Sequence, residues 1–149
     1  MPPRHDWRTF RSPGHRLVLT TVRVSEKLKR AADRFLRPYR LSLPQFNLLA
    51  VLYANPEGAQ QSKLGEEFTV SRANVTGLVR RLAARGLCSV GTSDRDARIR
   101  RVRITRRGTE LLNRIERPYF LEIARITGTL DGRSMDKTSD LLERLSRVL

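Results

Sequence analysis

Two short helical segments separated by only two residues lie in the middle of this chain, and this spacing limits the folds open to it. Helical patterning covers residues 61–68 and again residues 71–85, with Thr69 and Val70 between them. Gly86 predicts the end of the second helix, because glycine readily adopts the left-handed conformation of a helix C-cap. Two helices joined by so short a turn predict a helix-turn-helix.

The apolar pattern changes from helical spacing to strict alternation directly after this unit. Cys88 and Val90 alternate with small or polar residues, and Val102 and Ile104 alternate with basic or polar residues. Turn formers and charged residues fill residues 93–100 between them. This arrangement predicts a two-stranded ribbon with a basic tip.

Longer helices flank this central unit. On the N-terminal side, apolar residues over residues 17–35 recur in alternating steps of four and three, which predicts a helix that ends before Pro38. A second helix is expected after a Ser42 cap with Pro44 in its first turn. We expect this second helix to bury Phe46, Leu49, Ala50 and Tyr53.

On the C-terminal side, Thr105 is expected to cap a long helix that Pro118 kinks and that ends between Gly128 and Gly132. A final amphipathic helix is expected from about Ser134. One short chain that also carries a helix-turn-helix cannot bury the apolar stripes of both its first and last helices. We therefore expect a homodimer joined through these outer helices.

The expected fold class is mainly α with a small β-wing, a winged helix-turn-helix with N- and C-terminal dimerisation helices. Residues 1–14 mix proline with charge and are expected to form a flexible basic arm. Residues 15–149 are expected to form a single domain. Within it, the winged helix-turn-helix covers about residues 42–105, and the dimerisation helices cover about residues 15–37 and 106–149.

The charge of the chain favours a polyanionic partner. Thirty lysines and arginines against fifteen aspartates and glutamates give a net charge of +15. The excess is concentrated, since residues 71–108 hold eleven arginines and two aspartates, whereas residues 109–149 hold seven basic and seven acidic residues. Nucleic acid is therefore the leading candidate partner of the chain.

The segment over residues 71–87 has one apolar helix face and one face of small residues beside an arginine. This second face suits a helix that enters the major groove of DNA, which is about 12 Å wide. The alternative is an amphipathic surface helix with a solvated basic face. The residues of this helix expected to contact DNA are Ser71, which is also its cap, and Arg72, Asn74, Thr76, Arg80 and Arg81.

The tip of the ribbon carries a second group of candidate DNA contacts, Arg95, Arg98 and Arg100. An arginine in a narrow minor groove gains from the enhanced negative potential there. A solvated hairpin is the alternative. Arg98 is also placed to pair with Asp96 and stiffen the tip, which is compatible with a DNA contact.

The ribbon resembles the wing of the MarR family. Residues 96–108 read DARIRRVRITRRG and match the family's wing pattern, D-x-R-x-x-x-V-x-L/I-T-x-x-G, at every fixed position. Residues 71–82, SRANVTGLVRRL, resemble the recognition helix of that family, and residues 41–52, LSLPQFNLLAVL, resemble its second helix. In the order and length of its helices, the similarity covers about residues 15–149.

The resemblance implies a transcriptional regulator. Members of this family are dimers built from the first and last two helices, bind palindromic DNA, and are often released by a small aromatic or phenolic effector. We therefore expect a sequence-specific repressor with these partners. Arg80 stands where the family commonly has an acidic residue, which makes this DNA face more basic. Cys88 is expected to be a buried core thiol, since the family's peroxide sensors use a cysteine in the first helix and this chain has none there.

Other classes of function find no support in the sequence. No apolar run approaches the roughly 20 residues of a membrane span, and residues 1–13 lack a signal-peptide core, so we expect a cytoplasmic protein without a membrane partner. One cysteine and two histidines exclude an internal disulfide and a zinc cluster, and no cofactor is expected. There is no carboxylate pair, nucleophilic triad or glycine-rich phosphate loop, so no enzyme activity is expected.

Two alternatives stay open in the sequence. A sequence-tolerant structural protein of nucleic acids, such as a ribosomal or nucleoid factor, would be equally basic, whereas a regulator prefers one palindrome over random duplex by about 10³-fold or more. The aromatic residues Trp7, Tyr39, Tyr53 and Tyr119 are candidate walls of an effector pocket, but each also fits an ordinary core or surface aromatic. No ligand site is assigned from the sequence.

Overall fold

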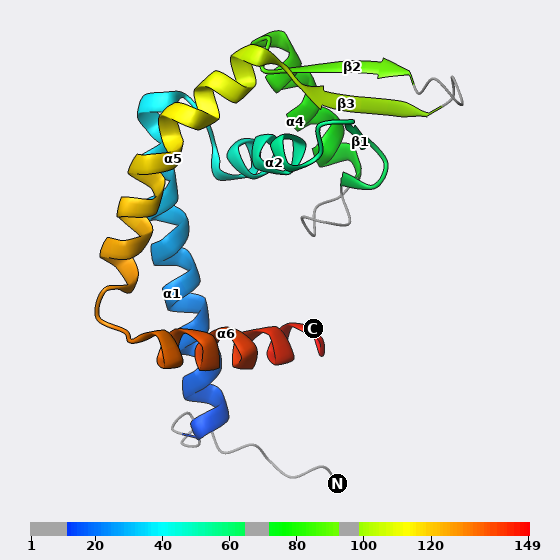
Figure 1. Ribbon diagram of the computed structural model, residues 1–149. Coiled ribbons are helices and arrows are strands. Elements are labelled where there is room, and N and C mark those ends of the chain that lie inside the picture. Colours follow the sequence, from blue (N-terminus) through cyan, green and yellow to red (C-terminus); the bar gives the residue numbers. More distant parts are fainter. Residues whose placement is uncertain (1–11, 65–71, 93–98) are drawn as a thin grey trace, which may run out of the picture.

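The computed structural model describes residues 12–64, 72–92 and 99–149. It has two parts, a frame of the helices α1, α5 and α6 and a smaller head. Figure 1 shows α1 and α5 running side by side, α6 crossing α1 away from the head, and α2, α4 and the strands forming the head. The predicted class, mainly α with a small β-wing, is confirmed. The helices are α1 (Pro13–Leu36), the 3-10 helix η2 (Arg37–Tyr39), α2 (Leu43–Ala54), α4 (Arg72–Ala84), α5 (Arg106–Thr127) and α6 (Gly132–Ser146), and the strands are β1 (Ala59–Gln60), β2 (Cys88–Thr92) and β3 (Arg100–Ile104).

The hydrophobic core lies in the head and at its junction with the frame. The first half of α5 contributes buried residues, but α1 contributes only Leu36 and α6 contributes none. The head is therefore packed within one chain, whereas much of the frame is not. The side chains with less than 2% exposure are Leu36, Leu48, Leu49, Leu52, Leu64, Val75, Leu82, Val102 and Ile115.

The predicted two-stranded ribbon is present as the antiparallel pair β2 and β3, and the short strand β1 joins it in a three-stranded sheet of order β1-β3-β2. In this sheet Ala59 pairs with Val102. Two residues are too few for an alternating pattern to reveal β1. Before β1 the chain turns at Gly58, which is buried and has φ +83°, a conformation that favours glycine. Arg101 Nη1 fixes this turn by donating to the Gly58 carbonyl oxygen at 2.8 Å.

The C-terminal end of α4 has the geometry expected from Gly86. Gly86 has φ +68°. Its N–H donates to the Ala83 carbonyl oxygen at 2.8 Å, and the Leu87 N–H donates to the Leu82 carbonyl oxygen at 3.0 Å. This is a Schellman motif, which satisfies the last carbonyls of the helix and turns the chain directly into β2.

Thr105 and Gly108 join the wing to α5. The Thr105 hydroxyl donates to the Gly86 carbonyl oxygen at 2.6 Å and accepts from the Gly108 N–H at 3.1 Å. Thr105 thus caps α5, as predicted, and also ties it to the end of α4. Gly108 is buried against the chain that follows α4, and a Cβ atom on it would overlap the Leu87 carbonyl oxygen and approach Ile104 Cγ1 to 2.8 Å.

Several boundaries and burial assignments differ from the predictions. Ala50 and Tyr53 are exposed, and α2 instead buries Leu48 and Leu52 beside Phe46 and Leu49. The reason is that α2 is apolar nearly all round, so its periodicity does not select one face. The last helix begins at Gly132, because Asp131 caps it by accepting from the Ser134 N–H at 2.7 Å.

Two other predicted features have a mixed outcome. α5 continues through Pro118 as one helix and ends where Gly128 was expected to end it. Residues 61–63 form a turn where a helix was expected, and residues 65–68 of that predicted helix lie outside the described residues.

The close approach at Gly108 predicts that Gly108→Ala lowers the free energy of unfolding by about 1–3 kcal/mol, because the added methyl must push apart α5 and the Leu87 backbone. Gly132→Ala is the matched control, since a Cβ there meets nothing within 4 Å and alanine favours the helix. Urea unfolding at one protein concentration measures both. Equal stability of the two variants would contradict the account of this junction.

Candidate nucleic-acid interface

The two faces of α4 separate as the sequence predicts. Val75, Leu78, Val79 and Leu82 are buried against the head. Opposite them, the exposed side chains include four of the predicted contacts, namely Asn74, Thr76, Arg80 and Arg81. The same element therefore anchors itself through one face and presents polar and basic groups on the other.

No side chain projects from the centre of the exposed face of α4, because Gly77 lies there. A Cβ atom at Gly77 would meet only the Arg81 guanidinium, at 3.7 Å from Nη2. This glycine weakens the helix by about 1 kcal/mol relative to alanine without filling the core. The small surface leaves room for a close approach by a partner, with the Arg81 guanidinium beside it.

Gln61, which the sequence analysis did not identify, contacts the exposed face of α4. Its side-chain Nε2 donates to Thr76 Oγ1 at 3.3 Å, across fifteen residues of chain. Its Oε1 is buried and has no hydrogen-bond partner within the described residues. The contact arises from the fold of the loop after β1, so no local pattern could have revealed it. Gln61 holds the Thr76 side chain at one edge of α4.

Two neighbouring arginines of the wing differ in exposure, and one of them is a predicted DNA contact. Arg100 is exposed at the start of β3. Arg101, by contrast, lies partly buried and donates to the carbonyl oxygens of Gly58 and Glu57. The other predicted contacts at the wing tip, Arg95 and Arg98, lie outside the described residues, as does the suggested pair of Arg98 with Asp96.

At the start of α4, the helix begins at Arg72, and Ser71, its predicted cap, also lies outside the described residues. The structure thus brings Asn74, Thr76, Arg80 and Arg81 onto one surface of α4 and places Arg100 on the wing.

Few carboxylates neutralise the arginines of this region. In the described ranges, the ion pairs are Glu26 with Lys29 on α1, and Arg106 with Glu110 and Glu122 with Arg125 on α5. None of these pairs lies on α4 or on a strand. The basic charge of α4 and of the wing is therefore not compensated by ion pairs in the described structure, and it is available to a polyanion.

Cys88 lies beneath this interface in a buried position. Its thiol donates to the Val79 carbonyl oxygen across 3.7 Å, and burial raises the pKa of the thiol to about 11. A thiol that stays protonated near neutral pH is a poor nucleophile, as expected for a core cysteine. The strand face predicted for it is only partly correct, because Val90 is exposed.

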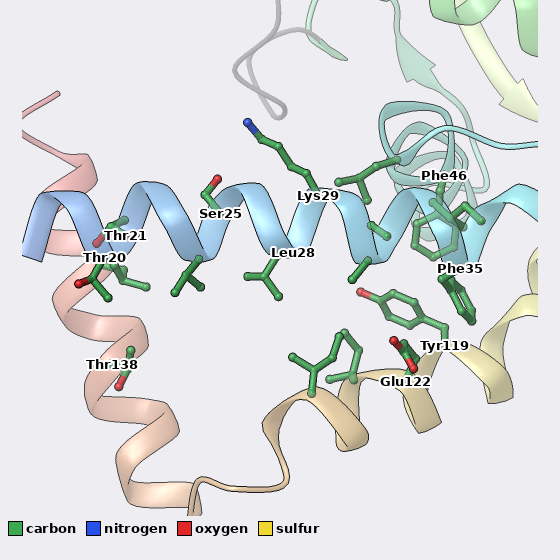
Figure 2. A pocket seen from close by; sticks show the side chains of 18 residues that line it. Thr20, Thr21, Ser25, Leu28, Lys29, Phe35, Phe46, Tyr119, Glu122 and Thr138 are labelled. Carbon is green, nitrogen blue, oxygen red and sulfur yellow. The ribbon is translucent and has the colours of Figure 1, made fainter.

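An apolar cavity of about 610 Å³ opens between α1, α2, α5 and α6, away from the interface. Leu28 and Tyr119 point into it from α1 and α5, with Phe35 and Phe46 at one end and Thr138 toward the other (Figure 2). The Tyr119 ring lies 5.1 Å from the Phe46 ring and 6.1 Å from the Phe35 ring, measured between centroids. Three aromatic rings thus form one wall of the cavity.

Two further types of site find no support in the described residues. None of the described helices combines the length and the apolarity needed to cross a membrane. The same residues contain no group of three or more His, Cys, Asp or Glu side chains that could hold a metal ion.

A helix with a buried apolar face and an exposed basic face, followed directly by an antiparallel wing, defines a winged-helix protein. The model of the MarR family matches residues 41–99, a range that includes α2, β1, α4 and β2. Over this segment, which is 59 of the 149 residues, the chain is similar to the MarR family. No curated protein sequence matches the chain.

Solved structures share this fold over most of the chain. MepR from S. aureus, solved in a complex with DNA, is 19% identical, with 89% of this chain and 97% of that chain covered and a TM-score of 0.81. A mutant MarR from E. coli, complexed with operator DNA, is 19% identical, with 94% and 98% covered and a TM-score of 0.80. CouR from Rhodococcus jostii RHA1, bound to p-coumaroyl-CoA, is 19% identical, with 87% and 90% covered and a TM-score of 0.79.

Proposed function

We propose that this chain is a sequence-specific transcriptional repressor that binds a palindromic operator as a homodimer and is released by a small aromatic or phenolic effector. The exposed face of α4, where Asn74 and Arg81 flank the low surface at Gly77, carries the proposal. A face of this kind can approach base edges in the major groove, where hydrogen-bond patterns distinguish all four base pairs. The proposal assigns the chain no catalytic step.

The wing supplies the second contact in this proposal. Arg100 and the sequence-predicted Arg95 and Arg98 would contact the adjacent minor groove. An arginine there recognises the width and the electrostatic potential of the groove more than the identity of the bases. Two of the similar solved structures, MepR and the mutant MarR, are complexes with DNA, which supports the same mode here. Ser71 and Arg72 complete the proposed contacts at the start of α4.

The frame supports a homodimer. α6 buries no residue within the chain, and large apolar side chains stay exposed along α1 and α5 as well. A second copy of the same frame would cover them symmetrically, and the two-fold axis would place two copies of α4 on successive half-sites about one helical turn apart. Residues 15–37 and 106–149 would then be the dimerisation helices, and residues 42–105 the DNA-binding unit. Exposed members of this apolar surface include Leu17, Val22, Leu28, Phe120, Leu121, Leu141 and Leu142.

The cavity of the frame supports an effector. Its aromatic wall of Phe35, Phe46 and Tyr119 suits the face of a planar ring. The Glu122 carboxylate and several hydroxyls also line it and offer hydrogen bonds to a phenol. Because α1, α2 and α5 all contribute, occupancy would change how the head sits on the frame. CouR, a similar structure, is bound to p-coumaroyl-CoA, whose acyl group is phenolic.

A sequence-tolerant nucleoid-type protein is the second candidate, supported by the net charge of +15. Both candidates bind DNA with a strong dependence on salt, at a slope near −0.9 per phosphate neutralised. Only the regulator prefers a particular inverted repeat.

The first prediction of this proposal separates base contacts from backbone contacts. The DNA is a duplex that the wild-type protein selects from a random pool. Asn74→Ala should cost about 1–3 kcal/mol in binding at one base position and relax the preference there. Arg100→Ala should weaken binding to every duplex alike, because its contact carries little base identity. Fluorescence anisotropy against a base-substitution series at two salt concentrations measures both effects, with Arg117→Ala on α5 as the exposed-arginine control.

Selection that yields no consensus, together with equal affinities for selected and scrambled duplexes, would contradict a regulator and favour the nucleoid-type protein. Uniform weakening by Asn74→Ala would contradict its assignment as a base contact.

The second prediction concerns the cavity. Free p-coumarate should raise the dissociation constant for the selected duplex at least fivefold, since it stabilises a state with lower DNA affinity. Ala32→Leu fills part of the cavity and should abolish this response while leaving DNA binding without p-coumarate unchanged. Ala54→Leu, exposed at the end of α2, is the matched control. A response of equal size in the two variants would place the effector elsewhere.

A further inference from the structure

A second cleft, of about 740 Å³, lies where η2 and the start of α2 meet the end of α4 and the start of α5. It is separate from the apolar cavity, with which it shares no lining residue. None of the residues that line it is acidic. Five of them are arginines drawn from distant parts of the sequence, Arg40, Arg81, Arg85, Arg107 and Arg114.

The arginine cleft is held together by hydrogen bonds that use only one of its guanidinium groups. Arg85 donates from Nη1 to the Arg40 carbonyl oxygen at 2.5 Å and from Nη2 to the Tyr39 carbonyl oxygen at 3.2 Å. These bonds fasten the end of α4 to η2. Partial burial, followed by the charges of Arg40 and Arg107, lowers the pKa of Arg85. The fold therefore gathers like charges here without a carboxylate to offset them.

Two helix N-termini add to this positive potential. Gln45 belongs to the first turn of α2 and Arg107 to the first turn of α5, and neither first turn contains an acidic residue. The N-terminal end of a helix carries a partial positive charge, which favours an anion. The C-terminal end of α4 acts in the opposite sense, but it contributes Arg81 and Arg85 to the cleft. Glu110 on α5 does not neutralise the cleft, because it pairs with Arg106 at 2.9 Å.

We propose that the arginine cleft binds a phosphate group, and that at least two guanidinium groups of the cleft contact this phosphate. Planar guanidinium groups present paired N–H donors that match phosphate oxygens, and a concave site concentrates their charge. The phosphate comes either from the DNA backbone beside α4 or from a free phosphorylated compound. In both cases a bound phosphate would link α4 to α5, because Arg81 and Arg114 approach it from these two helices.

The experiment uses inorganic pyrophosphate as the probe and the full chain at constant ionic strength. Isothermal titration calorimetry compares the wild type with the double variant Arg107→Gln/Arg114→Gln, both exposed cleft residues. Arg117→Gln is the matched control, because Arg117 is exposed on the same helix but does not line the cleft. The double variant should bind pyrophosphate at least tenfold more weakly, and the control should stay within twofold of the wild type.

A second arm identifies the source of the phosphate with a random-sequence duplex, measured first without and then with pyrophosphate. If the DNA backbone supplies it, the double variant should bind every duplex more weakly, and pyrophosphate should compete with DNA. The salt slope of the double variant should then be shallower by about 0.9 for each phosphate that it no longer neutralises. If a free compound supplies the phosphate, the affinity of the double variant for DNA should match that of the Arg117→Gln control.

A weakening in either arm that is specific to the double variant supports the site. Equal behaviour of the double variant and the control toward both pyrophosphate and DNA would overturn it. This test is independent of the proposed regulation, because the wild-type protein can bind the selected duplex whether or not the cleft holds a phosphate.

Discussion

The Thr105 hydroxyl is the contact on which the arrangement of the DNA-facing elements depends. It joins the end of α4, through the Gly86 carbonyl oxygen, to the start of α5, through the Gly108 N–H. The wing leaves α4 and returns to α5 at this one point. Gly108 allows the approach because it has no side chain to separate α5 from the preceding backbone. A short local network thus contributes to the orientation of the wing relative to α4.

The chain divides its chemistry between two regions. The head buries its own core and leaves Arg80 and Arg81 of α4 and Arg100 of β3 at the surface. The frame leaves apolar side chains exposed and encloses an aromatic-walled cavity. An apolar surface of this extent on long helices is expected to be covered by another protein surface. The polar head and the apolar frame are thus suited to different partners, a polyanion and a second copy of the chain.

Local patterns predicted the features that depend on neighbouring residues. Gly86 and Thr105 set boundaries through their own backbone and side-chain hydrogen bonds, so the helix ends there could be read from the sequence. The two faces of α4 followed from its periodicity. The bond from Gln61 to Thr76 and the arginine cleft could not be predicted, because each forms between segments that only the fold brings together. The burial expected for Tyr53 failed since α2 is apolar on more than one side.

The central claim is that a second copy covers the frame and so places two α4 helices on one palindrome. Sedimentation equilibrium at micromolar concentration tests it most directly. The account predicts a single species of about twice 17.1 kDa, with the helix content of the folded chain. A species of 17.1 kDa that keeps its helix content at the same concentration would contradict it.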